Sequence, residues 1–128
     1  MEILQKKLLL STYVAHGRGS GDNYAVAFSN RPGSYQSSLG FFRTGDTYMG
    51  KNGYSLFLDG LEKGINDKAR ERAIVVHGAN YADPAVLKGQ QRLGRSLGCP
   101  ALPPDISKQV IDTIKGGVLL YIYGLNKA

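Results

Sequence analysis

The chain has 128 residues, of which 42% are hydrophobic and 20% charged, and this excludes an extended disordered segment and predicts one folded domain with a sizeable core. The net charge of +6 suits anionic partners, but the basic residues are scattered and no recognisable motif orders them, which disfavours nucleic acid. A single cysteine excludes an internal disulfide, and no apolar run is long enough for a transmembrane segment.

The first half of the chain has the pattern of short strands joined by glycine-rich turns. Strands are predicted at residues 7–15, 24–28, 38–44, 48–50 and 53–58, with turns at 45–46 and 51–53. Residues 60–70 are polar and indicate a loop. Glycines alternate in the loop at residues 16–21, but this loop lacks the spacing and the Lys-Ser/Thr pair of a phosphate-binding loop.

The second half contains the most strand-prone triplet and the best helix. Residues 72–78, with Ile-Val-Val at 74–76, predict a buried central strand. Asp83 is placed to cap a short helix that Gly89 ends. Apolar residues recur at helical spacing before Gly116, and a last strand is predicted at 118–123. The predicted fold class is mainly β, a sheet or sandwich of short strands with one substantial helix near residues 104–115.

The only cysteine, Cys99, lies in a glycine-rich loop, and His77 ends the predicted central strand. A cysteine nucleophile reacts as the thiolate and needs a base or a lowered pKa. We interpret Cys99 as the nucleophile and His77 as its base, with the carbonyl of Gly78 orienting the other ring nitrogen. The amides of Gly98 and Cys99 are the candidate oxyanion hole.

Other roles for these residues compete with this interpretation. A lone cysteine is often an inert buried residue, and a histidine at a strand end often makes only a structural hydrogen bond. His16 opens a second His-Gly pair and is read as a loop-organising side chain in preference to a second active-site group. A zinc site formed by His16, His77 and Cys99 is disfavoured because no pair of ligands has metal-binding spacing, so no metal is expected.

The segment Ser96-Leu97-Gly98-Cys99, preceded by the pair His77-Gly78, resembles the YkuD-like L,D-transpeptidase catalytic domain, and in particular its murein L,D-transpeptidase branch. Matching stretches run in order from about residue 15 to residue 123, including AHGRGSG at 15–21, RAIVVHGA at 72–79 and GRSLGCPA at 94–101. Leu97 stands where the wider family has a second histidine, and the interval between His77 and Cys99 is longer than usual; both departures resemble the branch.

The resemblance implies a single catalytic domain over residues 1–128, trimmed at its N-terminus relative to longer relatives, that acts on peptidoglycan stem peptides. Cys99 would attack the carbonyl after the third, diamino-acid residue, and the terminal D-alanine would leave. The side-chain amine of a second stem would then resolve the thioester into a 3→3 cross-link. Further candidates for substrate binding or loop organisation are Arg95, Ser96, His16 and Tyr48.

Two alternatives share most of these features. Water as the acceptor would make the protein an L,D-carboxypeptidase with the same residues. A non-catalytic cell-wall binding domain would need neither Cys99 nor His77, so their presence disfavours it. The resemblance further implies no cofactor, a carbapenem-sensitive nucleophile, a monomer, and a periplasmic or cell-envelope location reached by export.

Overall fold

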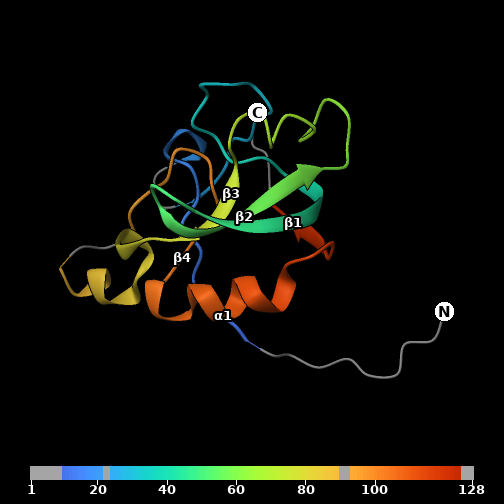
Figure 1. Cartoon of the computed structure of the whole chain (residues 1–128). Coiled ribbons are helices and arrows are strands. Elements are labelled where there is room, and N and C mark those ends of the chain that lie inside the picture. Colours follow the sequence, from blue (N-terminus) through green and yellow to red (C-terminus); the bar gives the residue numbers. More distant parts are fainter. Residues whose placement is uncertain (1–9, 22–23, 90–92, 125–128) are drawn as a thin grey trace.

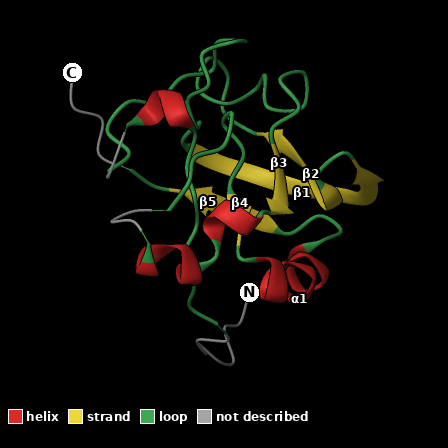
Figure 2. Cartoon of the chain, turned by 90° about the vertical axis from the view of Figure 1, so that its left-hand side faces the viewer, coloured by secondary structure: helices red, strands yellow, loops and turns green. Residues whose placement is uncertain are grey.

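The computed structural model describes residues 10–21, 24–89 and 93–124, and it confirms a mainly β fold. Its centre is a curled five-stranded sheet with the order β4-β3-β2-β1-β5 (Figures 1 and 2). All neighbouring strands are antiparallel except β3 and β4, which are parallel. The strands are β1 (Gly40–Gly50), β2 (Gly53–Gly60), β3 (Val75–Gly78), β4 (Ala101–Leu102) and β5 (Leu119–Ile122).

One α-helix, α1 (Pro104–Ile114), lies along one face of this sheet (Figure 1). Its bounds confirm the helix predicted near residues 104–115, and Gly116 follows it with a φ of 81°. The apolar stripe of the helix packs on a core formed by residues of β1, β2 and β3. Buried side chains of this core include Phe42, Leu56, Leu58, Val76 and Ile111.

Three 3₁₀ turns complete the elements: η1 (Arg18–Ser20), η2 (Asn80–Ala82) and η3 (Pro84–Lys88). The last confirms the predicted short helix, because the Asp83 carboxylate accepts a hydrogen bond from the amide of Ala85 at 2.9 Å. Gly89 follows as its C-cap. The helical segment is therefore capped as its sequence indicates, although its hydrogen bonds have the tighter 3₁₀ pattern.

Two of the predicted strands are wrong within the described residues. Residues 24–28 form no strand, because the amides of Val26 and Ala27 both donate to the carbonyl of Ser20 instead of to a neighbouring strand. In the segment 7–15, residues 7–9 lie outside the described residues and residues 10–14 form no strand. Ala15 makes only an isolated antiparallel bridge to Ala101. β-prone composition alone does not form a strand without a partner edge.

The predicted turn at residues 45–46 is also wrong, since β1 runs through it as one strand of 11 residues with a bulge. The register with β2 shifts between Thr44 and Thr47, and the carbonyl of Gly45 accepts a hydrogen bond from the amide of Gly116. A bulge reverses which side chains face the core. Thr44 and Thr47 therefore both occupy core-side positions, and the next residue, Tyr48, points to the opposite face.

The register across the sheet decides which side chains share the face opposite α1. Tyr48 pairs with Ser55, Ser55 pairs with His77, and His77 pairs with Ala101. Residues paired across neighbouring strands point to the same side of a sheet. The side chain of His77 therefore shares a face with Tyr48, while Val76 points toward the core and α1.

Asn66, in the loop after β2, is fully buried and ties this loop to β1. Its amide donates to the carbonyls of Leu39 and Phe41, each at 2.9 Å, and its side-chain oxygen accepts from the amide of Glu62. We expect Asn66→Ala to lower the free energy of unfolding by about 2–3 kcal/mol, because it leaves buried polar groups without partners. Chemical denaturation would measure this, with the exposed Asn52→Ala as control at about 0.5 kcal/mol or less. Equal effects of the two variants would contradict the prediction.

Candidate functional site

The loop that carries Cys99 is held at both ends by the segment around His16. At one end the amide of Ser96 donates to the carbonyl of His16 at 3.0 Å, and the amide of Arg18 donates to the carbonyl of Ser96 at 2.8 Å. At the other end Ala15 and Ala101 exchange two backbone hydrogen bonds. The His16-Gly17 pair and the Gly98-Cys99 pair, which are about 80 residues apart in sequence, thus lie side by side.

Close packing of glycines makes this approach possible. A Cβ atom added at Gly17 would lie 2.5 Å from the carbonyl oxygen of Tyr35 and 2.8 Å from the Cα of Gly98. Gly98 has a φ of 126°, a region that disfavours other residues, and a Cβ atom there would lie 2.9 Å from Ile74 Cδ1. Both positions therefore require glycine, for space at Gly17 and for space and conformation at Gly98.

Ser96 organises the interior of the loop. Its hydroxyl donates to the carbonyl of Cys99 at 2.6 Å and accepts a hydrogen bond from the amide of Gly98 at 3.1 Å, and the residue is buried. The loop geometry therefore depends on this side chain. The amide of Gly98, a predicted oxyanion donor, points to Ser96 in this structure, whereas the amide of Cys99 has no hydrogen-bond partner among the described residues.

The thiol of Cys99 lies against the beginning of β3. Its Sγ accepts a hydrogen bond from the amide of Val75 and donates one to the carbonyl of Ala73, both at 3.4 Å. Burial raises the pKa of the Cys99 thiol, while the Val75 amide and the positive charges of Arg72 and Lys51 act in the opposite direction. Since burial dominates, the free thiol is protonated at neutral pH, and its use as a nucleophile requires a base.

The imidazole of His77 is buried, and its Nδ1 lies 2.9 Å from the carbonyl oxygen of Gly78. A carbonyl can only accept, so Nδ1 carries a proton, and the neutral ring then has its lone pair on Nε2. Gly78 itself packs against the first turn of α1, where an added Cβ atom would lie 2.5 Å from Ser107 Oγ. The ring that is predicted to act as base thus has a defined tautomer.

The structure places Cys99 in the bend just before β4 and His77 on the neighbouring strand β3, and no hydrogen bond joins the two side chains. The amide of His77 faces the carbonyl of Pro100 at 3.4 Å, directly after Cys99. The thiol sits at Val75, two residues or about 7 Å of extended strand from His77. Among the described residues, neither side chain has another polar partner beyond those given above. Direct proton transfer would require the two side chains to approach to about 3 Å when substrate binds.

The remaining predicted site residues fall into two groups. Tyr48 lies in the same cross-sheet row as His77 and stacks on Phe57, with the ring centroids 4.4 Å apart. His16 and Arg95 instead meet at the carbonyl of Gly21, which His16 Nε2 approaches to 3.0 Å and Arg95 Nε to 3.4 Å. Arg95 also donates to the carbonyls of Leu93 and Gly94, so both side chains organise the loops beside Cys99.

Sequence reasoning assigned no role to Arg72, although it lies in the same segment as His77. Its half-buried guanidinium reaches across to residues 29–38 and hydrogen-bonds four acceptors there, the carbonyls of Ser29 and Gln36 and the hydroxyls of Ser34 and Ser38. An arginine placed directly before a buried strand, with no acidic residue at helical or strand spacing to pair with it, is the signal that could have drawn attention to it.

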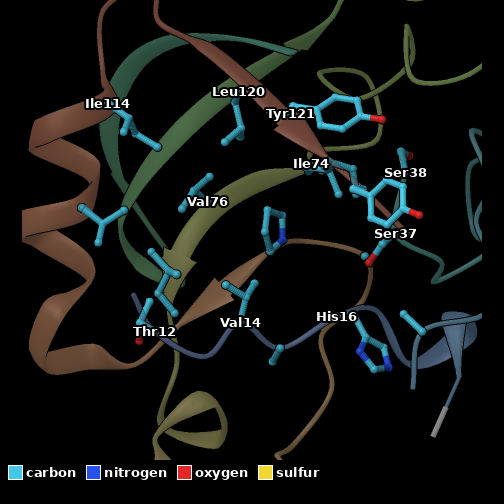
Figure 3. A pocket seen from close by; sticks show the side chains of 18 of the residues that line it. Thr12, Val14, His16, Ser37, Ser38, Ile74, Val76, Ile114, Leu120 and Tyr121 are labelled. Carbon is cyan, nitrogen blue, oxygen red and sulfur yellow. The ribbon is translucent and has the colours of Figure 1, made fainter. Parts of the chain in front are cut away.

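A large apolar cavity of about 890 Å³ opens between α1, the sheet and residues 10–16 (Figure 3). Val76, Ile114 and Leu120 line one side, and Thr12 and Val14 line the other (Figure 3). Gly98 and Pro100 border it, but Cys99 and His77 are not among its lining residues. The cavity therefore reaches both residues that flank Cys99 in the chain, whereas Val76 on its wall points away from the face that carries His77.

Within the described residues, no group of three or more histidine, cysteine, aspartate or glutamate side chains is arranged to hold a metal ion. The described part of the chain also contains no helix with the length and apolar character needed to cross a membrane.

The chain matches a known protein family. The family model YkuD_2, described as an L,D-transpeptidase catalytic domain, matches residues 1–123 of the chain. No curated protein matches the sequence significantly. The matched range includes both His-Gly pairs, the cysteine loop and every strand of the sheet.

Proposed function

The chain belongs to the L,D-transpeptidase catalytic domain family, and from this we propose that it is a cysteine-dependent L,D-transpeptidase with Cys99 as nucleophile and His77 as base. The family indicates an L,D-transpeptidase-type enzyme with peptidoglycan as substrate. The observation that carries the residue assignment is the hydrogen bond between His77 Nδ1 and the carbonyl of Gly78, which leaves the Nε2 lone pair available on the strand next to Cys99.

In the first half-reaction, His77 Nε2 accepts the thiol proton as Cys99 Sγ bonds to the carbonyl carbon through which the diamino acid of the donor stem is joined to D-alanine. The tetrahedral oxyanion accepts hydrogen bonds, and the amide of Cys99, which has no partner among the residues that the structure describes, is the first donor for it. The Gly98 amide can serve as the second donor once it exchanges its bond to Ser96 for one to the oxyanion. The C–N bond to D-alanine then breaks, and His77 returns the proton to the leaving amine.

In the second half-reaction, the side-chain amine of an acceptor stem attacks the thioester. His77 takes a proton from this amine, the C–S bond breaks, and the thiolate of Cys99 is reprotonated. The face that carries His77 also carries the half-exposed ring of Tyr48, which supports a peptide-binding role for that residue. Arg95, His16 and Ser96 contribute by shaping the loop, since their polar groups bond to its backbone.

A hydrolytic outcome remains the second candidate, because water can replace the acceptor amine at the same thioester. YkuD domains generally act on the cell wall, and this supports the proposal of a periplasmic or cell-envelope location reached by export. A binding module without catalysis is the least supported alternative, since binding requires neither the thiol of Cys99 nor a histidine of defined tautomer on the neighbouring strand.

Incubation with tetrapeptide stems, followed by mass spectrometry of the products, tests the proposal. We expect a cross-linked dimer that has lost one D-alanine, together with free D-alanine. Tripeptide without dimer would identify a carboxypeptidase. If the stems stay intact and a carbapenem leaves the intact mass of the protein unchanged, Cys99 is not an activated nucleophile and the proposal is wrong.

A further inference from the structure

The guanidinium of Arg72 connects the cysteine loop to the segment 29–38. Its Nη1 donates to Ser29 O at 2.8 Å and to Ser38 Oγ at 2.7 Å, and its Nη2 donates to Gln36 O at 2.7 Å. The Nη2 atom also lies 3.4 Å from the position that a Cβ atom of Gly98 would take. Arg72 therefore fills the space behind the loop, immediately next to the residue that precedes Cys99.

All four acceptors of this guanidinium are neutral, and Arg72 forms no ion pair among the described residues. An arginine in a half-buried site stays charged. The Cys99 thiol is a nearby group that can become an anion, and the charges of the two residues interact, so that Arg72 lowers the pKa of Cys99 and a thiolate raises that of Arg72. A charge without a counterion among the described residues is thus held next to Gly98, the residue that precedes Cys99.

The backbone between the two groups has an unusual conformation. Ala73 has a φ of 57°, a region that a residue with a side chain rarely adopts, and its carbonyl accepts the hydrogen bond from the Cys99 thiol. This turn sends the side chain of Arg72 to the segment 29–38 and the carbonyl of Ala73 to the sulfur. Backbone strain of this kind persists where the surroundings hold the residue in place, and here the four bonds of Arg72 do so.

We propose that Arg72 is a positioning residue for the Cys99 nucleophile: its guanidinium ties the segment 29–38 against the cysteine loop and keeps a positive charge behind the sulfur. This inference rests on the proposed role of Cys99. When His77 removes the thiol proton, the sulfur can no longer donate to Ala73, but the Val75 amide and Arg72 still favour its negative charge.

The pH dependence of alkylation of Cys99 by iodoacetamide tests this inference without any need for turnover. Other charged or titratable groups that act on the thiol or lie on the neighbouring strand are Lys51, Tyr81 and His77, and all three stay unchanged in the variants. We expect Arg72→Gln to move the alkylation profile about one pH unit upward, which makes the reaction about tenfold slower below the midpoint. Arg70→Gln is the matched control, because Arg70 pairs with Asp59 at the surface, and its profile should coincide with that of the wild type.

Arg72→Lys distinguishes the effect of the positive charge from that of the hydrogen bonds, since lysine keeps the charge but lacks the planar guanidinium that bonds all four acceptors. We expect it to retain most of the alkylation profile and to lose about tenfold in turnover of stem peptides. A folded Arg72→Gln variant with the wild-type profile would overturn the inference. If Arg72→Gln does not fold, Arg72→Lys decides, and wild-type turnover in that variant would overturn it. Absence of turnover in the wild type would reject the proposed function. The pH dependence of Cys99 alkylation in Arg72→Gln would still test whether Arg72 acts on the thiol.

Discussion

Cys99→Ala is expected to abolish both acyl transfer and the covalent adduct with a carbapenem, with turnover reduced by at least about 10³-fold. The variant removes the atom to which the acyl group is bonded, and no other cysteine in the chain can replace it. Product formation from tetrapeptide stems and the intact mass of the protein after carbapenem treatment would measure the two effects.

The fold should survive this substitution. The thiol makes two weak hydrogen bonds at 3.4 Å and packs only at the margin of the core. Cys99→Ser is the matched control, since it preserves the size of the side chain and tests whether a hydroxyl at this position supports any transfer. A carbapenem adduct on folded Cys99→Ala would place the nucleophile elsewhere and reject the assignment.

His77→Gln is expected to reduce turnover by about 10²–10⁴-fold at neutral pH, because glutamine cannot accept the thiol proton. Burial raises the pKa of Cys99, so without a base the thiolate forms only in alkaline solution. The residual activity of the variant should therefore rise with pH up to the pKa of the thiol and then level off. Initial rates measured from neutral to alkaline pH, over the range in which the variant stays folded, would reveal this dependence.

The matched control for His77 is His16→Gln, which removes the other histidine of the chain. His16 is bonded to the carbonyl of Gly21 and organises a loop, so its replacement should leave the pH dependence of the rate unchanged in form even where the rate falls. If His77→Gln has the wild-type rate at neutral pH and the wild-type dependence of the rate on pH, a different group must serve as the base.

Local sequence patterns predicted the elements whose stability depends on neighbouring residues. The capping aspartate before η3, the apolar stripe of α1 and the hairpin between β1 and β2 are all readable from a few residues, and the structure confirms them. The strand predicted at 24–28 is wrong for a reason outside that segment, because the carbonyl of Ser20 takes two of its amides. The bulge in β1 is likewise bonded to a residue far away in sequence, since the carbonyl of Gly45 accepts from the amide of Gly116.

The candidate site divides in the same way. Cys99 and His77 could be selected from the sequence because thiol and imidazole chemistry restricts the choice to one cysteine and two histidines. Arg72 could not, since arginine is common and its importance lies in four acceptors contributed by residues 29–38 and in its position next to Gly98. The role of Ser96 inside the loop also follows only from its contacts.

By itself the sequence determined the mainly β character, the single substantial helix and the family, and it selected the two candidate side chains, because composition, periodicity and short motifs are local properties. The tertiary structure alone decided which strands pair, that Tyr48 and His77 share the face opposite α1, and that the His16 segment holds the cysteine loop. It also decided that Arg72, which has no carboxylate partner in the described part of the chain, lies against Gly98. These features depend on contacts between distant residues, whose free energies arise only once the sheet has formed.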